Sequence, residues 1–145
     1  MRRASSTSPR TSPTRCRRRP ALAVLDVIAE EDLVGQAAAR GEYMLARLRE
    51  LQGQHEPIGD VRGRGLLLGL ELVEDRESRR PADALGAAVT RECYERGLSM
   101  NIVRSQAHAN CFRMAPPLTV TEAEIDLAVE IMDASLRAVR EPAPA

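Results

Sequence analysis

Apolar residues recur every three or four positions along much of this chain, the spacing that is typical of amphipathic helices. The longest such stretch predicts a helix from Leu33 to Gln54, with Gly53 and Pro57 ending it. A shorter stretch ahead of it, in which Leu22, Leu25 and Ile28 share one face, predicts another helix. The first third of the chain is therefore expected to be largely helical.

Two further helices are indicated by their ends as well as by their periodicity. Pro81 suits the first turn of a helix that runs to about Arg96, and Gly97 is a suitable stop. Thr121 and Glu124 have the spacing of a capping box at the start of the last helix. The apolar stripe of that helix consists of Ile125, Ala128, Val129, Met132, Leu136 and Val139.

The remaining apolar stretches alternate or are short, which favours strands. A strand pair or one bent strand is predicted over 58–73, with the bend at Gly63–Gly65. Residues 98–103 and 111–114 read as two more strands. Together these elements predict an α+β fold, in which helices cover one face of a small, mostly antiparallel sheet.

Charge divides the chain into two unlike parts, although 21 basic and 21 acidic residues give the 145-residue chain a net charge of zero. Residues 1–20 contain seven arginines and no acid, with almost no apolar content, so we predict a disordered basic segment. Residues 21–145 contain the other 14 arginines and all the acids, and we predict one domain there. The basic segment could be a nucleic-acid or membrane-surface arm, a transit peptide, or a start without function.

All 21 basic residues are arginine, and the chain contains no lysine. Schiff-base catalysis needs an amine whose pKa can be lowered, which a guanidinium cannot provide. An enzyme that holds pyridoxal phosphate or a keto substrate on a lysine cannot be complete in this sequence.

Composition excludes several other classes of protein. Aromatic residues make up 2% of the chain, which argues against stacking platforms for nucleic-acid bases. No apolar run approaches the roughly 20 residues of a membrane span. Cys16, Cys93 and Cys111 form neither a zinc pattern nor a disulfide framework, so we expect a cytoplasmic protein without metal, nucleic-acid or membrane partners.

Few residues are candidates for chemistry. Gly63, Gly65 and Gly69 lead into a strand and not a helix, so they indicate a bend and not a dinucleotide loop. Arg113 lies in a short apolar strand with Phe112 and Met114 on the opposite face, and its guanidinium matches a carboxylate. An internal ion pair or simple exposure would explain Arg113 equally well. His55 and His108 are expected on the surface, and Asp60 and Glu71 form no recognisable base–nucleophile pair.

Several stretches resemble the small C-terminal domain of class III pyridoxal-phosphate aminotransferases. The glycine–arginine stretch 58–66, followed by 70–73, is typical of that superfamily. The stretches 81–83, 90–93, 97–103 and 112–120 are more similar to 2,2-dialkylglycine decarboxylase. The resemblance covers roughly residues 20–140.

This resemblance implies a dimeric or tetrameric enzyme of fold type I whose catalysis is divided between domains. A large domain would supply the Schiff-base lysine and the pyridoxal phosphate site, and in the decarboxylase branch an alkali metal site as well. The small domain would supply an arginine that binds the carboxylate of the amino-acid substrate, and Arg113 stands at that position. The resemblance places no catalytic, cofactor-binding or metal-binding residue in this chain.

The sequence therefore predicts a fragment of a decarboxylation-dependent transaminase that is inactive alone. A frame error would explain the basic start: GC-rich codons for Thr14–Arg19, read from the preceding G, encode Asp-Pro-Leu-Pro-Ala-Ala, a sequence that family members carry there. The alternative is a non-catalytic interaction or regulatory module with a basic N-terminal arm.

Overall fold

The computed structural model describes residues 14–103 and 110–140. Contacts within the chain divide it into two units, 1–33 and 34–145. The first unit contains helix α1 (Thr14–Glu30), which includes Pro20. A helix was predicted around Leu22, but the observed helix begins earlier, inside the segment expected to be disordered. The predicted division at residue 20 stays a prediction, because residues 1–13 lie outside the described part.

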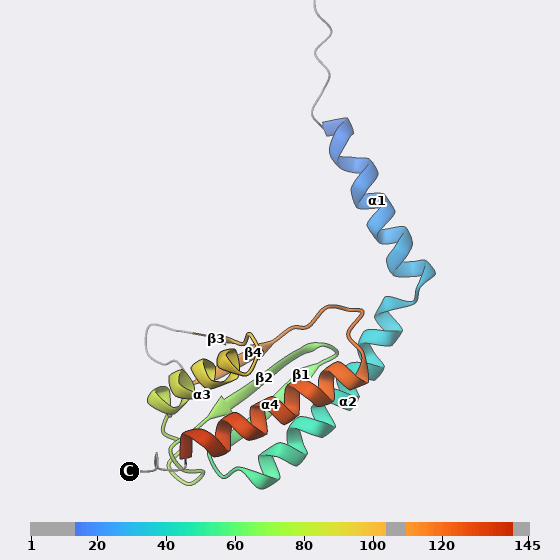
Figure 1. Cartoon of the computed structure of the whole chain (residues 1–145). Coiled ribbons are helices and arrows are strands. Elements are labelled where there is room, and N and C mark those ends of the chain that lie inside the picture. The colour runs from blue at the N-terminus through green and yellow to red at the C-terminus, as the bar shows by residue number, and fades with distance from the viewer. Residues whose placement is uncertain (1–13, 104–109, 141–145) are drawn as a thin grey trace, which may run out of the picture. The chain divides into compact units, whose positions relative to one another are not determined.

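The second unit contains the sheet and three helices (Figure 1). Its helices are α2 (Leu33–Gln54), α3 (Asp83–Glu95) and α4 (Glu122–Arg140). Its strands are β1 (Ile58–Arg64), β2 (Leu67–Leu72), β3 (Asn101–Val103) and β4 (Cys111–Met114). The strand order is β1-β2-β4-β3, and all neighbours are antiparallel. The predicted α+β class is confirmed.

Alternation along the strands explains why the helices cover one face of this sheet. On β2, Leu68, Leu70 and Leu72 are at most 2% exposed, whereas the residues between them face the other side. Phe112 and Met114 continue the buried row on β4. Burying each such side chain contributes about 1.5–3 kcal/mol, so register is strongly fixed in the central strands.

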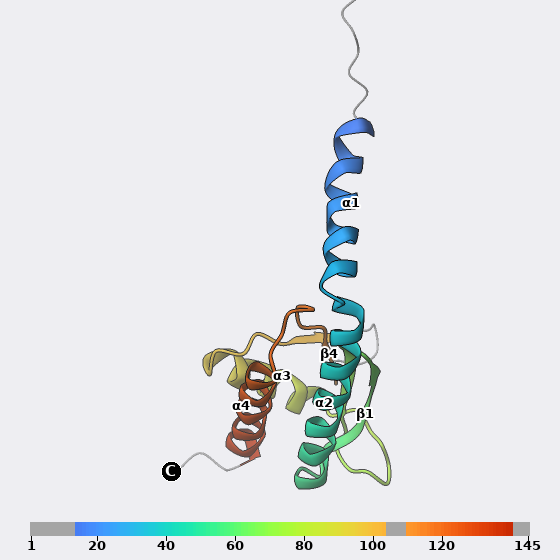
Figure 2. The same cartoon turned by 90° about the vertical axis from the view of Figure 1, so that its right-hand side faces the viewer.

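The helices bury their apolar stripes against that face and against one another. Helix α2 places Met44, Leu48 and Leu51 in the core, and α4 places Ile125 and Met132 there. In both views α2 and α4 run side by side (Figure 1 and Figure 2). The predicted bounds of α2 and the stripe of α4 are confirmed, whereas Val34 and Ala38, which were expected on the apolar face of α2, are exposed.

The bend between β1 and β2 is a tight hairpin. Arg64 pairs with Leu67, which leaves a two-residue turn that begins at Gly65 with a φ of +52°. Glycine with positive φ in the first turn position is typical of type II′ hairpins. A Cβ atom on Gly41 of α2 would lie 2.3 Å from the carbonyl carbon of Gly65, so the helix backbone passes directly against this turn.

The start of α3 differs from the prediction. Pro81 does not begin the helix; it pairs with Val73 in an isolated antiparallel bridge, and the Ala82 amide donates to the Leu72 carbonyl. The helix starts at Asp83 instead. Proline is compatible with this extended connection, because the bridge does not use an N–H at residue 81.

The end of α3 follows the prediction, since Gly97 has a φ of +93° and stops the helix. The Gly97 amide donates to the Tyr94 carbonyl, and the Leu98 amide donates to the Cys93 carbonyl, which is the Schellman pattern. These bonds hold Leu98 at the helix end, so the strand predicted from residue 98 begins only at Asn101.

Candidate functional site

Arg113 lies on β4, the strand between β2 and β3. Its backbone is opposite Gly69 on one side and Asn101 on the other. Because Phe112 and Met114 are buried against the helices, the strand pleat directs the exposed Arg113 to the uncovered face. The predicted alternation is confirmed, and a guanidinium is held on a strand fixed by its two buried neighbours.

A hollow of about 460 Å³ opens beside Arg113. The segment 98–100 lines one part of it, and Ala115, Pro116 and Pro117 line another. Met44 of α2 and Ala128 of α4 complete the lining. Apart from Arg113 and Ser99, the residues that line this hollow are apolar.

A second hollow, of about 310 Å³, shares part of that lining. Five residues belong to both hollows, namely Met44, Leu98, Pro116, Pro117 and Ala128. Val120 and Ile125 add further apolar surface, and Glu124 stands at this end. The two hollows therefore lie next to each other.

A separate hollow of about 470 Å³ lies beside Arg62, Arg76 and the acids Asp60 and Glu71. Arg62 contacts Asp60 and lies 3.2 Å from Glu71, and the Asp60 hydrogen bond is the main reason that the pKa of Arg62 is raised. Arg76 donates to the backbone carbonyls of His55 and Glu56 at the end of α2. Asp60 and Glu71 both form ion pairs with Arg62, and they do not form a base–nucleophile pair.

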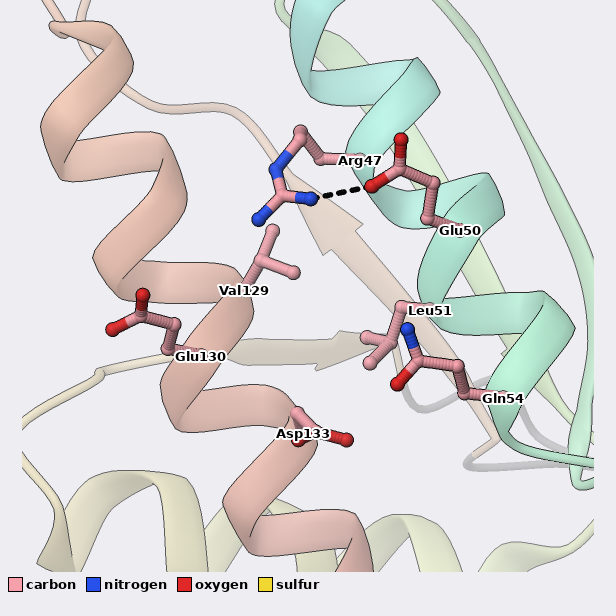
Figure 3. Close-up of a pocket in the computed structure, with 7 residues that line it drawn as sticks. All are labelled: Arg47, Glu50, Leu51, Gln54, Val129, Glu130 and Asp133. Carbon is pink, nitrogen blue, oxygen red and sulfur yellow. Dashed lines mark hydrogen bonds and ion pairs between the residues drawn. The ribbon is translucent and has the colours of Figure 1, made fainter.

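The groove between α2 and α4 is the smallest of these spaces, about 110 Å³ (Figure 3). Arg47 contacts Glu50 and donates to Asp126 across the two helices at 2.8 Å. Tyr43 also donates to Asp126, at 2.9 Å. The Arg47 bond is the main reason that the pKa of Asp126 lies below its usual value. This network joins two helices and leaves little room for a ligand.

His55 corrects an expectation, because it is 3% exposed and does not lie on the surface. Its Nε2 lies 2.6 Å from the Asp133 carboxylate of α4, and Arg137 donates to the same carboxylate at 3.0 Å. The partners are 78 residues apart in the chain, so local sequence carries no signal for this pair. His108 lies outside the described residues.

The cysteines and acids of the described residues form no reactive or metal centre. Burial raises the pKa of the Cys93 and Cys111 thiols, which favours the unreactive protonated form. Within the described residues, no group of three or more His, Cys, Asp or Glu side chains is arranged to hold a metal ion. No helix in this part of the chain has the length and apolar character needed to cross a membrane.

Comparison with known proteins identifies the family. The model of the family described as aminotransferase class III matches residues 13–136. The chain belongs to the aminotransferase class III family. The matched region begins seven residues ahead of the boundary predicted at Pro20, and this family depends on pyridoxal phosphate.

Individual relatives agree with that assignment. An uncharacterised aminotransferase of Schizosaccharomyces pombe is 42% identical over 78% of this chain and 25% of that protein. A taurine–pyruvate aminotransferase of Rhodobacter capsulatus is 44% identical over 81% of this chain and 26% of that protein. The structure of a Bacillus anthracis aminotransferase matches with a TM-score of 0.77 and 34% identity, over 81% of this chain and 27% of that one. The class III chain described here thus spans about a quarter of the length of these relatives.

Proposed function

We propose that this chain forms the small C-terminal domain of a class III pyridoxal-phosphate enzyme and that Arg113 binds the carboxylate of its amino-acid substrate. The exposed position of Arg113, on a strand fixed by two buried neighbours, carries this proposal. Arginine presents a planar pair of donors that matches a carboxylate, and a fixed strand limits how the bound acid can be oriented. Such a contact would help to select which bond of the substrate reacts.

We further propose decarboxylation-dependent transamination, as in 2,2-dialkylglycine decarboxylase, as the reaction of the complete enzyme. The stretches 97–103 and 112–120 support this choice through their resemblance to that enzyme; they include β3 and most of β4, the strand that carries Arg113. The complete enzyme would act on amino acids as a cytoplasmic homo-oligomer.

The residues of this chain do not fit the cofactor by themselves. Pyridoxal phosphate enzymes attach the cofactor to a lysine amine, and all 21 basic residues here are arginine. The lysine, the phosphate-binding groups and the alkali metal site of the decarboxylase branch would come from sequence outside these 145 residues. We therefore assign this chain a role in substrate binding and no chemical step.

Titration of the chain with propionate tests the Arg113 assignment directly. The side-chain N–H signals of Arg113 in NMR spectra are expected to shift and saturate, and Arg113→Gln is expected to abolish the effect. Arg64→Gln is the matched control, because Arg64 is also an exposed arginine, at the end of β1. Equal propionate binding by wild type and Arg113→Gln would refute the assignment.

The upstream DNA, read in the shifted frame, tests the assignment to a larger enzyme. If that frame encodes a lysine-bearing large domain, joining it to residues 21–145 is expected to create the absorbance band of lysine-bound pyridoxal phosphate. In that enzyme Arg113→Ala is expected to raise KM for the amino acid by the equivalent of about 1–3 kcal/mol. Unrelated upstream sequence would favour the non-catalytic module, which the family match does not support.

A further inference from the structure

Helix α1 carries apolar side chains that lie in contact with water. Four of them are between 44% and 60% exposed, namely Leu22, Val24, Leu25 and Val27. Among the described residues, the core cluster begins at Met44, and the partly buried hydrophobic residues packed against it begin at Ala37. A lone helix of this length is marginally stable in water unless its apolar side is packed. Helix α1 therefore presents a surface that suits another polypeptide.

The apolar residues of α1 include one regular row. Leu22, Leu25 and Ile28 follow one another at intervals of three and share one side of the helix. We call these three residues the α1 stripe. Val27 lies on the opposite side from Leu25, because each residue turns a helix by about 100°. The stripe is the kind of row through which two helices pack against each other.

The charges of α1 are arranged against its own dipole. Its first turn contains no acid and its last turn contains no base. By sequence, residues 14–20 include four arginines, whereas residues 26–32 include four acids. A helix favours negative charge at its N-terminal end and positive charge at its C-terminal end. A partner that brings acids to the first end and arginines to the second would correct both mismatches.

We infer that α1 pairs in an antiparallel manner with α1 of a second copy of this chain, through the α1 stripe. When the two Leu25 residues face each other, residues 18–20 of one copy come level with residues 30–32 of the other. Each arginine-rich end then meets an acidic end, and the two stripes overlap. A parallel pair would instead place arginine-rich ends together.

The self-complementary order of charges favours a second copy as the partner. A two-fold axis through the middle of α1 exchanges its basic and acidic ends, and the two surfaces of a symmetric dimer must match in this way. The inference uses unit 1 alone, so it does not depend on the proposed carboxylate contact of Arg113.

Sedimentation equilibrium of the full 145-residue chain tests this inference. The 15.9-kDa chain is expected to form dimers with a Kd on the order of micromolar. Raising NaCl from about 50 mM to about 500 mM is expected to raise that Kd at least about fivefold, because opposite charges face each other. A parallel pair would show the reverse change, since salt would screen repulsion between like charges.

Leu25→Ser and Val27→Ser are matched variants that test the stripe. Both replace an exposed apolar residue of α1 with serine, but only Leu25 belongs to the stripe. Leu25→Ser is expected to raise the Kd at least about tenfold, and Val27→Ser less than about twofold. Because serine lowers helix propensity at both positions, a general loss of helix would affect the two variants alike.

Glu30→Arg tests the charges separately. It is expected to raise the Kd at least about fivefold at low salt and to reduce the salt dependence. The change also places a base at the C-terminal end of α1, which favours the helix, so a damaged helix would not explain weaker pairing. Glu95→Arg is the matched control, because Glu95 is likewise an exposed acid at the last residue of a helix, α3.

Dimers that weaken with salt, with Leu25→Ser and with Glu30→Arg, but with neither control, would support the antiparallel pair. A chain that stays monomeric up to about 0.5 mM would overturn the inference and leave the exposed side of α1 to a different polypeptide. Equal effects of Leu25→Ser and Val27→Ser, or a dimer that tightens with salt, would overturn it as well. None of these results would alter the propionate titration, which tests Arg113 independently.

Discussion

Among the described residues, some charged side chains join two elements of the fold, and others are exposed on its surface. Asp133 of α4 is of the first kind. Its carboxylate accepts a hydrogen bond from Arg137 of the same helix and contacts His55 at the end of α2. Arg113 is exposed on the uncovered sheet face and belongs to the second. Removing the Asp133 carboxylate should therefore affect stability.

The first prediction concerns the pH dependence of stability at Asp133. Its pKa lies below the usual value, mainly because Arg137 donates to its carboxylate, with a further contribution from His55. The folded state therefore binds this proton less readily than the unfolded state, whose aspartate pKa is about 3.9. The stabilisation is present above that pH and is lost as the pH falls through the lower folded pKa.

Asp133→Asn is accordingly expected to lower stability by about 1 kcal/mol at pH 6, a value reduced by the partial exposure of the side chain. The gap in Tm between variant and wild type should narrow below about pH 4. Thermal unfolding across pH 3–7 measures both quantities. Glu130→Gln, on an exposed position of the same helix, serves as control, and a gap independent of pH would contradict the prediction.

Arg113 and His55 show which features of a residue can be predicted from the local sequence. The orientation of Arg113 was predicted because alternation with two apolar neighbours fixes its direction in any sheet. His55 was missed because its burial depends on Asp133, 78 residues away, and nothing near His55 in the chain distinguishes it from a surface histidine. Pairs of this kind are fixed by tertiary packing and not by periodicity.

At the scale of elements, the contact between α2 and the β1–β2 hairpin is unusually close. A Cβ atom on Gly41 would lie 2.3 Å from two backbone atoms of Gly65, and Gly65 itself needs its positive φ. Neither backbone can move without shifting a helix or a hairpin. The absence of a side chain at Gly41 allows these elements to meet, whereas Gly65 is needed for its positive φ, since a Cβ atom there would lie 3.6 Å from the nearest atom.

The second prediction follows from that contact. Gly41→Ala is expected to cost about 3 kcal/mol or more, because the clash is with backbone and not with the end of a flexible side chain. Gly53→Ala in the same helix is the matched control: nothing lies within 4 Å of its Cβ position, and alanine should stabilise it by up to about 1 kcal/mol. Urea unfolding of both variants decides the matter, and similar effects of the two would rule out the close approach.

A third prediction concerns the start of α4. Thr121 Oγ1 accepts from the Glu124 amide at 3.2 Å, while the Glu124 carboxylate accepts from the Thr121 amide, so both halves of the capping box are formed. Thr121→Ala is expected to lower the free energy of unfolding by about 1 kcal/mol. Thr119→Ala, two residues earlier and outside the helix, should have a smaller effect in the same denaturation experiment. The reverse order would argue against the cap.

Helix ends set by local chemistry were predicted well, as was the strand 111–114, whereas the start of α3, where a bridge competes, was not. The capping box and the Gly97 stop are satisfied by neighbouring backbone groups, so the sequence displays them directly. Pro81 was misplaced because its bridge to Val73 is a tertiary contact that competes with the helix start. The beginning of α1 was set too late because its first turn lies in arginine-rich sequence without apolar periodicity.

At the scale of the whole molecule, the buried core belongs to the second unit. The core cluster runs from Met44 to Leu136 and includes residues of α2, α3, α4 and the strands. On α1, by contrast, Leu22 and Leu25 are 58% and 60% exposed. The family match includes residues of both units, but the buried core cluster that would stabilise an independent fold lies in the second.

The fourth prediction is that residues 32–145 fold without the preceding segment. Their unfolding is expected to stay cooperative, with a Tm within a few degrees of the full chain, because no member of the core cluster is removed. The truncated chain should also aggregate less, since it loses the exposed apolar residues of α1. Calorimetry and light scattering at equal concentration test both points. A non-cooperative transition in the truncated chain would mean that α1 supports the core. Increased aggregation would mean instead that α1 shields apolar surface of the second unit, and either result would contradict the division drawn from the contacts.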